Sequence, residues 1–506
     1  MSCRGEPVNI AENFIAGQRV LSESAEQRSV WNPATGEEIG RTPISTDSEV
    51  ESAVAAAKAA AEGWAQTPLS TRQQIMFSIR QALIDHTEEI AQLITLENGK
   101  TIEDARMELR RGLEAIEYAC GIPQLLKGEH SSTVANGIDV HSVRQPLGIV
   151  ACITPFNFPV MVPLWMLANA LACGNTAVLK PSDKTPSASL RMVEVLLEAG
   201  LPAGVLNLVH GDKDAVETLM SHPDVDGVSF IGSTPVAKIV YETAAANGKR
   251  VQALGGAKNH LVVLPDADME AAANAVVASA FGAAGERCMA VSVLVTVGDA
   301  AELLLPRIAD LIAGLNVGDG ATGGRDLGPL ISGEHRDRVA SYLDRGVAEG
   351  AELYVDGRSE TVSQGPGFFL SPSVIDRVTP EMSVYLEEIF GPVLSVVRAA
   401  TLDEALTLVN EHEFGNGAVI FTEGGGNARE FQLKCNAGMV GVNVPIPTPV
   451  GWFSFGGWKS SLFGDSHMYG PDGIRFFTRQ KVITTRWSEV SGNNPESFPF
   501  HMGALA

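Results

Sequence analysis

The first residue whose surroundings suggest chemistry is Cys288, within FGAAGERCMA at residues 281–290. A run of small residues precedes this thiol, and Arg287 is its immediate neighbour. The adjacent cation would lower the thiol pKa, although Glu286 would oppose that effect. A lone cysteine is more often a buried and inert thiol. Cys288 is therefore a candidate nucleophile. For that role, other parts of the chain must provide an oxyanion site, a site for an electron acceptor and residues that bind the substrate.

A second motif, TPFNFP, offers a rigid amide at residues 154–159. It follows an apolar segment that reads as a strand and precedes one that reads as a helix. Asn157 lies between aromatic and proline residues, which would hold its side chain in one orientation. A fixed amide donor can stabilise an oxyanion beside a nucleophile. The alternative is an ordinary turn or helix-cap residue.

Two further motifs could hold a dinucleotide, although the usual GxGxxG fingerprint is missing. Lys180 and Asp183 follow a strand, where they can hold an adenosine ribose. Ser233 lies in FIGST, whose backbone amides at a helix start suit a pyrophosphate. A third motif, EEIFGPV, contains Glu388 and joins a polar stretch to an apolar strand; its residues alone read as a solvated pair of acids. Asp183 would repel a 2′-phosphate and so favours NAD over NADP, but Lys184 beside it weakens that preference.

The elements that must position these motifs follow a regular order. Apolar strands alternate with helices over 148–254, and a second such series begins near residue 259. This alternation predicts βαβ units with parallel sheets, whose ligand sites lie where strands meet helices. Before them, Thr46 and Glu49 form a capping box that predicts a helix from Asp47. Helices are also predicted over 71–98, closed by Gly99, and over 102–127.

Outside the two series, the sequence predicts strands and loops. Residues 1–44 read as short strands and turns, and 451–478 as aromatic and glycine-rich loops. Residues 133–144 alternate around Asn136-Gly137, which predicts a β-hairpin. Its strands are polar on one side, which suits an arm that pairs with another subunit. KVITTRW at 481–487 reads as a late β segment, and a loose tail is expected from Ser491.

Composition excludes several classes of protein. The 506 residues, 45 % of them hydrophobic, predict more than one domain. A net charge of −23 argues against nucleic acid and anionic membranes as main partners. The six cysteines show no metal-binding spacing, so no metal is expected, and their scatter suggests a reducing compartment. With no apolar signal core and no run of about 18 apolar residues, a soluble cytoplasmic protein is expected.

Taken together, PFNFP, KPSDKTP, FIGST, LGG, GERC and EEIFGPV resemble the aldehyde dehydrogenase superfamily along nearly the whole chain. The resemblance implies an α/β fold with two Rossmann-type domains and a β-hairpin oligomerisation arm. The NAD-binding domain would comprise 1–128 and 147–254, the catalytic domain 255–455, and the arm 129–146 with a C-terminal strand within 470–490. A homodimer or homotetramer is implied.

The same resemblance assigns roles to individual residues. It implies that Cys288 is the nucleophile and that Asn157 is an oxyanion donor. The implied NAD contacts are Thr154, Phe156, Lys180, Asp183, Lys184, Ser233, Gly255 and Glu388. An intact set of Cys288, Asn157 and Glu388 argues against a non-catalytic protein on the same fold.

One departure from the family pattern concerns the acyl acceptor. Hydrolytic members carry a glutamate just before LGG, as the base that activates water, and this chain has Ala253 there. Water is a poor nucleophile that needs such a base, whereas a thiol ionises near pH 8.5 and needs far less help. The missing base therefore predicts coenzyme A as co-substrate. The alternative is a hydrolytic enzyme that releases the free acid, in which Glu286 or Glu388 replaces the base.

GAKNH, GERCMA and the stretch 439–487 resemble the methylmalonate-semialdehyde dehydrogenases, a branch also called malonate-semialdehyde dehydrogenases (acetylating). Members of this branch bind the substrate carboxylate with two arginines, which match Arg111 and Arg287. A guanidinium fork suits a short acid aldehyde, and the alternative for Arg111 is a surface helix charge. The implied reaction oxidises and decarboxylates the aldehyde to propionyl-CoA or acetyl-CoA. Which aldehyde is preferred, and where coenzyme A binds, stay open.

Overall fold

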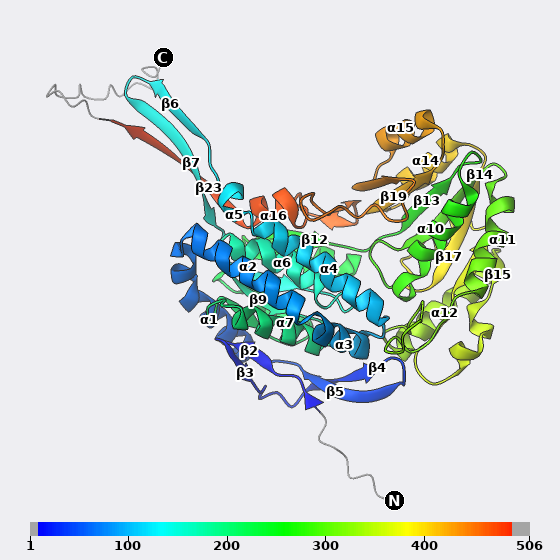
Figure 1. The fold of residues 1–506 in the computed structure, drawn as a ribbon, viewed down its shortest axis with the longest axis horizontal. Coiled ribbons are helices and arrows are strands. Elements are labelled where there is room, and N and C mark those ends of the chain that lie inside the picture. Colours follow the sequence, from blue (N-terminus) through cyan, green and yellow to red (C-terminus); the bar gives the residue numbers. More distant parts are fainter. Residues whose placement is uncertain (1–8, 488–506) are drawn as a thin grey trace, which may run out of the picture.

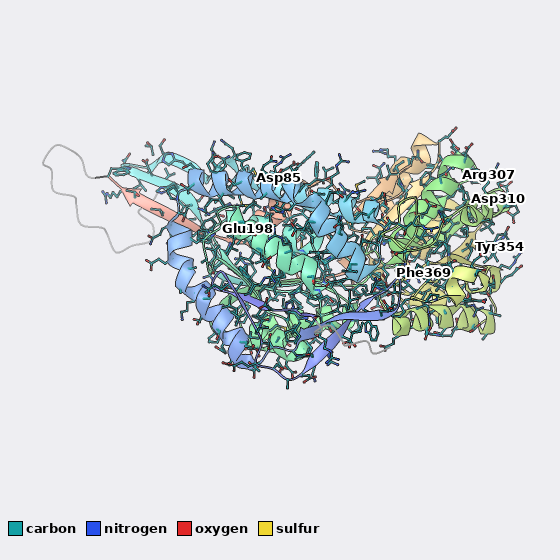
Figure 2. All side chains as sticks on the ribbon, turned by 60° about the horizontal axis from the view of Figure 1, so that its bottom comes forward. Asp85, Glu198, Arg307, Asp310, Tyr354 and Phe369 are labelled. Carbon is teal, nitrogen blue, oxygen red and sulfur yellow. The ribbon has the colours of Figure 1, made fainter. Side chains whose placement is uncertain are left out.

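The structure is a computed structural model, and it describes residues 9–487. It has two α/β lobes side by side and a thin arm of strands that projects from the first lobe (Figure 1). The same division is visible with side chains drawn, where Asp85 and Glu198 lie on the first lobe and Arg307, Asp310 and Tyr354 on the second (Figure 2). The predicted α/β fold class is confirmed. No helix within residues 9–487 has the length and apolar character needed to cross a membrane.

The first lobe is built on an eight-stranded sheet with strand order β22-β12-β11-β8-β9-β10-β2-β3. The five strands from β12 to β10 are parallel, and the outer strands are antiparallel. Every residue of β8 and β9 is buried, as expected for parallel strands covered on both faces. The strands are β2 (Asn13–Ile15), β3 (Gln18–Val20), β8 (Ile149–Ile153), β9 (Thr176–Lys180), β10 (Leu206–Leu208), β11 (Val225–Ile231), β12 (Arg250–Leu254) and β22 (Leu462–Phe463).

Helices cover both faces of this sheet. All residues of α6 are buried, because it lies at the centre of the lobe between the sheet and α4. A small sheet of β1 (Asn9–Ile10), β4 (Gln27–Asn32) and β5 (Glu37–Pro43) closes the lower edge in Figure 1. The helices are α1 (Asp47–Gln66), α2 (Leu69–Asp85), α3 (Thr87–Asn98), α4 (Ile102–Ala119), α5 (Ile122–Leu125), α6 (Met161–Ala172), α7 (Pro186–Glu198), α8 (Lys213–Ser221) and α9 (Thr234–Ala246).

The helix predictions before residue 128 are partly confirmed. The capping box of Thr46 and Glu49 starts α1, and Gly99 closes α3 in the left-handed conformation with φ 87°. The single helix predicted over 71–98 is wrong, because His86 leaves helical geometry with ψ 11° and separates α2 from α3. The helix predicted over 102–127 is also too long, since the chain turns at Gly121 between α4 and α5.

The second lobe holds a seven-stranded sheet with strand order β15-β16-β17-β14-β13-β19-β20, parallel except for β15. Helix α12 lies in a stretch for which the sequence pattern predicts no element. The strands are β13 (Asn259–Val263), β14 (Val291–Val297), β15 (Glu352–Val355), β16 (Ser373–Asp376), β17 (Val393–Ala399), β19 (Gly417–Phe421) and β20 (Met439–Val442). The helices are α10 (Met269–Phe281), α11 (Ala300–Ala313), α12 (Gly333–Ala348), α13 (Ser383–Leu386), α14 (Leu402–Glu411) and α15 (Gly425–Lys434).

The arm is a three-stranded antiparallel sheet of β6 (His130–Ala135), β7 (Ile138–Pro146) and β23 (Thr478–Arg486). This confirms the predicted hairpin around Asn136-Gly137 and the late β segment, which pairs with β7 from Thr478↔Pro146 to Arg486↔Ile138. The tail predicted from Ser491 lies outside the described residues.

The loops predicted over 451–478 are only partly correct. This stretch also contains β21 (Trp458–Lys459), which pairs with β18 (Phe414–Gly415), together with β22 and α16 (Gly470–Phe476). Strand β22 pairs with β12, so this late part of the chain completes the sheet of the first lobe.

Candidate active site

The turn that carries the candidate nucleophile is strained. Helix α10 ends at Phe281, and Ala283, Ala284 and Gly285 then adopt left-handed backbone angles with φ of 50°, 52° and 72°. Non-glycine residues cost about 1–2 kcal/mol each in this conformation. A Cβ atom at Gly285 would lie 2.4 Å from the carbonyl oxygen of Gly391. The turn therefore brings the GERC and EEIFGPV motifs, which are distant in sequence, into backbone contact.

Cys288 lies where two cavities meet. One cavity has a volume of about 250 Å³ and the other of about 360 Å³, and Cys288 and Phe158 line both. Among the cysteines in residues 9–487, Cys288 is the one that is not fully buried. A substrate in one cavity and an electron acceptor in the other could therefore both reach its sulfur.

The environment of Cys288 raises its thiol pKa instead of lowering it. Burial raises the pKa to about 12, and the Glu388 carboxylate adds to this effect. Arg287 and the backbone N–H groups of Cys288 and Met289 lower the pKa, but by less. Arg287 lowers the thiol pKa as predicted, but burial outweighs this effect, so the net shift is upward. The acid that opposes ionisation is Glu388, which the fold brings near, and not the sequence neighbour Glu286.

Asn157 is held as a donor beside this thiol. Its side chain is buried, and its Nδ2 donates to the carbonyl oxygen of Glu286 at 3.0 Å. It lines the 360 Å³ cavity together with Cys288. An asparagine amide has two N–H bonds, so one stays available after this hydrogen bond is made. The anchored amide can offer that second N–H to an oxygen next to the thiol.

Glu388 lies in the same cavity as Cys288. Its Oε1 accepts a hydrogen bond from the backbone N–H of Ala257 at 2.9 Å, and burial raises its pKa to about 7. A Cβ atom at Gly256 would lie 2.3 Å from Oε2, so this glycine permits the close approach of the carboxylate. Glu388 is therefore fixed in place and is partly ionised at neutral pH.

The other predicted NAD contacts divide into two groups. Phe156, Ser233 and Gly255 line the 360 Å³ cavity. Ser233 is also the N-cap of α9 and makes no side-chain cap bond, so its side chain leaves the N–H groups of Thr234 and Val236 open to an anion, while Pro235 between them has no N–H. The cavity does not reach the remaining predicted contacts, which are Thr154, Lys180, Asp183 and Lys184. Of these, Lys184 approaches it, with Nζ 5.2 Å from the ring centre of Phe156.

Two residues of this cavity lie outside every motif of the sequence, and they contact a third, Phe390, or its neighbour within EEIFGPV. His335 and Arg338 lie on α12, and Phe390 follows Glu388. His335 Nε2 lies 2.7 Å from the carbonyl oxygen of Phe390, and Arg338 donates to that of Ile389 at 2.8 Å. Burial lowers the pKa of His335 to about 4, so the ring is neutral at pH 7. Nothing in the pattern around residue 335 could have indicated them, because only the packing of α12 brings them to the site.

Glu286 lines neither of the two cavities. Its Oε1 accepts from the backbone N–H of Ile331 at 3.2 Å and lies 3.4 Å from His335 Nε2. Burial raises its pKa to about 8, so it is mostly protonated at neutral pH. Both facts argue against Glu286 as a base for water.

The 250 Å³ cavity contains both predicted substrate arginines. Arg111 Nη1 donates to both carboxylate oxygens of Glu114, at 2.8 and 3.1 Å. Arg287 Nη2 donates to the carbonyl oxygens of Ala278 and Ser279, at 2.6 and 2.7 Å. The Nε of Arg287 is buried and has no hydrogen-bond partner within residues 9–487. A donor left unpaired in this way favours a bound acceptor.

A missed signal was the spacing of charged residues on α4. Asp104, Glu108 and Arg111 are four and three residues apart, which places them on one helix face, and all three line the 250 Å³ cavity. Besides Arg287 and Cys288, the other polar lining residues are Lys100 and Thr448. The remaining lining residues are apolar: Met107, Phe158, Met161, Trp165, Ala283, Met289 and Ile446.

Ala253 is fully buried within β12, where it pairs with Phe230 on β11 and Phe463 on β22. It lines neither cavity. The position at which hydrolytic members place their base therefore holds a methyl group in the core of the first lobe.

Two α/β lobes that meet at a cysteine, with a rigid amide and an acid beside it, define the class of protein. The chain belongs to the aldehyde dehydrogenase family, whose model matches residues 20–483. It is 51 % identical to the malonate-semialdehyde dehydrogenase of Pseudomonas aeruginosa over 490 residues, which cover 96 % of this chain and 98 % of that protein. It is 50 % identical to malonate-semialdehyde dehydrogenase 1 of Geobacillus thermodenitrificans, over 95 % of this chain and 99 % of that one.

Solved structures agree with these relatives. The crystal structure of methylmalonate-semialdehyde dehydrogenase from Oceanimonas doudoroffii superposes with a TM-score of 0.94 at 51 % identity, covering 95 % of this chain and 99 % of that one. A structure from Sinorhizobium meliloti, described as a candidate methylmalonate-semialdehyde dehydrogenase complexed with NAD, has a TM-score of 0.95 at 47 % identity. The match covers 97 % of this chain and 100 % of that one.

Proposed function

We propose that this aldehyde dehydrogenase oxidises malonate semialdehyde or methylmalonate semialdehyde with NAD and passes the acyl group to coenzyme A, with loss of CO2. The observation that carries the proposal is the position of Cys288 between a cavity with two arginines and a cavity with a fixed acid. The relatives from Pseudomonas aeruginosa and Geobacillus thermodenitrificans, named for malonate semialdehyde, support the substrate class.

The residues around the 360 Å³ cavity fit a nicotinamide dinucleotide. The open N-terminus of α9 suits a pyrophosphate, and the Glu388 carboxylate can accept hydrogen bonds from ribose hydroxyls. The Sinorhizobium meliloti structure, which is complexed with NAD, supports this cofactor. When bound, NAD supplies the hydride acceptor for the oxidation. We further propose that Thr154, Lys180, Asp183 and Lys184 hold the adenosine half, beyond the 360 Å³ cavity.

The 250 Å³ cavity orients the substrate in this proposal. A short acid aldehyde carries a carboxylate, and Arg111 and Arg287 offer guanidinium donors to it in a mostly apolar cavity. The Nε of Arg287 is free to donate, whereas Arg111 already holds Glu114 and would share its donors. With the carboxylate held there, the aldehyde carbon can face the Cys288 sulfur.

Formation of the covalent bond needs proton removal from Cys288, because its pKa is about 12. We assign this to Glu388, which lies in the same cavity and has a pKa of about 7. The thiolate attacks the aldehyde carbon, and the second N–H of Asn157 with the backbone N–H of Cys288 stabilises the oxyanion. Loss of hydride from this adduct leaves an acyl thioester on Cys288.

The acyl thioester carries a β-carboxylate, which can leave as CO2 because the thioester carbonyl accepts the electron pair as an enolate. Protonation of the enolate gives an acetyl or propionyl thioester. Attack by the thiol of coenzyme A then transfers the acyl group and returns Cys288 to its thiol form. The alanine at position 253 supports a thiol acceptor, since it provides no base for water.

Product analysis with malonate semialdehyde and NAD, with and without coenzyme A, tests this proposal. We expect acetyl-CoA and CO2 in equal amounts with NADH when coenzyme A is present, and one turnover or very slow release without it. Steady release of free acid at the same rate in both reactions would contradict the thiol acceptor.

A hydrolytic enzyme is the second candidate, and one observation favours it. Glu388, with its pKa of about 7, lies beside Cys288 and could activate water in place of the missing glutamate. This role, like the removal of the Cys288 proton, competes with its proposed hydrogen bonds to the ribose. Because Glu388→Gln should also slow formation of the acyl-enzyme, deacylation is followed after the acyl-enzyme has formed: if Glu388 is the deacylating base, release of free acid from it should slow in this variant.

We also propose the division into an NAD-binding domain at 1–128 and 147–254, a catalytic domain at 255–455, and an oligomerisation arm at 129–146 with 470–490. The arm projects from the lobes, and Val482 on its edge strand β23 is 62 % exposed, which supports pairing between subunits (Figure 1). A homodimer or homotetramer fits this arrangement, and a cytoplasmic location is proposed with it.

A further inference from the structure

A buried ion pair lies directly behind the Asn157 segment. Lys100 Nζ donates to Glu108 Oε2 at 2.7 Å, and the two side chains are 2 % and 0 % exposed. The same Nζ donates to the backbone carbonyl oxygen of Asn157 at 2.6 Å and lies 4.2 Å from the ring centre of Phe158. Lys100 therefore contacts two successive residues of the segment that carries the amide donor.

Glu108 holds the other end of that segment. Its Oε1 accepts from the backbone N–H groups of Val160 at 2.8 Å and Met161 at 3.1 Å. Val160 is the N-cap of α6 and has no side-chain cap of its own, so the carboxylate takes over that function. One ion pair thus fixes the carbonyl group of residue 157 and the N–H groups of residues 160 and 161.

The chemistry of the pair favours a positioning role over a stabilising one. Buried ion pairs often contribute no more stability than apolar side chains of the same volume, because both charges lose their hydration. A buried ion pair instead fixes geometry, because each charged donor or acceptor holds its partners in short, directed hydrogen bonds. Here those partners are backbone atoms on both sides of Phe158, which lines both cavities.

We propose that Lys100 and Glu108 are positioning residues that fix the segment Asn157–Met161 and thereby hold the Asn157 amide in line with the Cys288 sulfur. The inference rests on the proposed role of Asn157 as oxyanion donor. Neither residue takes a proton or contacts the reacting carbon. They act by keeping the amide where the oxyanion forms, and a displacement of about 1 Å there can cost about 100-fold in rate.

A double-mutant cycle on kcat tests the proposal. Lys100→Met with Glu108→Gln removes both charges together and keeps an oxygen that can accept from the N–H groups of residues 160 and 161. We expect this double variant to lose about 10- to 100-fold in kcat, with KM for NAD changed less than about twofold. Asn157→Ala alone should lower kcat about 100- to 1,000-fold. In that background, the same two changes should lower kcat further by less than about threefold.

Two other results would overturn the proposal for different reasons. Equal losses in both backgrounds, with Asn157→Ala strongly impaired, would show that the pair does not act through Asn157 and would leave the oxyanion role intact. Unimpaired Asn157→Ala would refute the oxyanion role itself, and the positioning role with it.

Lys249→Met is a matched control for loss of a buried lysine. Lys249 Nζ also donates to two backbone carbonyl oxygens, those of His222 at 2.5 Å and Val225 at 2.8 Å, but it precedes β12, away from the cavities. We expect this variant to lower the unfolding temperature without changing kcat more than about twofold. If Lys100→Met/Glu108→Gln does not fold, Lys100→Arg keeps the charge and the pairing with Glu108 but moves the donors. A kcat loss there that vanishes in Asn157→Ala would support the proposal, and a loss that persists would overturn it.

Discussion

The two cavities that meet at Cys288 are built in opposite ways. The cavity proposed for the substrate is mostly apolar but also holds paired charges, Arg111 with Glu114 beside it and Lys100 with Glu108. The cavity proposed for the cofactor is lined by aromatic rings, by the glycines at 232, 255 and 256, and by a few polar side chains, with Glu388 as its acid. We therefore expect selectivity on the proposed substrate side to depend on side-chain charge, and binding on the proposed cofactor side to depend on the close approach that these glycines permit.

This difference predicts different responses to mutation. On the substrate side, one changed side chain should alter the preference among aldehydes and leave the chemistry in place. On the proposed cofactor side, a single added methyl group should displace the acid and weaken NAD binding, whichever aldehyde is the substrate. Cys288 belongs to both cavities, so its loss should remove all activity.

Removal of the thiol should have the largest effect. Cys288→Ala is expected to reduce NAD at less than about a ten-thousandth of the wild-type rate, since no other group can form the covalent adduct. Stopped-flow absorbance of NADH measures this. Cys435→Ala, at a buried cysteine of the second lobe, is the control and should keep wild-type activity. Turnover by Cys288→Ala would remove this residue from the mechanism.

An added methyl group on the cofactor side should have the next largest effect. The Cβ atom of Gly256→Ala would lie 2.3 Å from Glu388 Oε2, so the carboxylate must shift. We expect KM for NAD to rise about 100-fold, with KM for the aldehyde changed less than about threefold. Gly63→Ala has open space around its Cβ atom and should change neither constant. An unchanged KM for NAD would place the cofactor elsewhere.

Loss of one arginine on the substrate side should affect one class of substrate. Arg111→Leu is expected to raise KM for malonate semialdehyde about 30-fold, because a hydrogen bond between charged groups is lost. KM for propanal, which has no carboxylate, should change less than about twofold. Arg110→Leu, at the exposed neighbouring position, provides the control. Equal effects on both aldehydes would reject the carboxylate role.

The pH dependence should reveal whether Glu388 takes the thiol proton. Its pKa is raised to about 7, so the basic form accumulates above pH 7. The rate of thioester formation should rise about tenfold between pH 6 and pH 8 and then level off, and Glu388→Gln should lose this dependence. If the thiolate of Cys288, with its pKa of about 12, formed without this base, the rate would rise about 100-fold over the same range and continue to rise.

The smallest expected effect is a lower KM for the substrate. Glu114 holds Arg111 Nη1 at 2.8 Å and competes with the substrate carboxylate for it. Glu114→Gln should weaken that competition and lower KM for malonate semialdehyde about threefold, as expected for the loss of a partly exposed ion pair. KM for propanal provides the internal control and should not change. A raised KM for malonate semialdehyde would instead mean that Glu114 orients Arg111.

Much of the fold could be predicted from the sequence, because local sequence patterns and tertiary structure agree. The capping box of Thr46 and Glu49 starts α1, and the all-apolar strands β8 and β9 are buried on both faces. The failures lie where no local signal exists. His86 divides a continuous helical pattern, and α12 brings His335 and Arg338 to the cofactor cavity without any motif.

The sequence alone determined which reactive groups this protein has: a thiol behind an arginine, a rigid amide, and an alanine where a base for water was expected. These are properties of residue identity and order, and folding does not change them. Only the tertiary structure decided how they behave. Burial and the approach of Glu388 raise the Cys288 pKa that its neighbour Arg287 would lower, because desolvation depends on everything packed around a group. In the same way, Glu114 and the Lys100–Glu108 pair acquire their roles only through contacts that the folded chain creates.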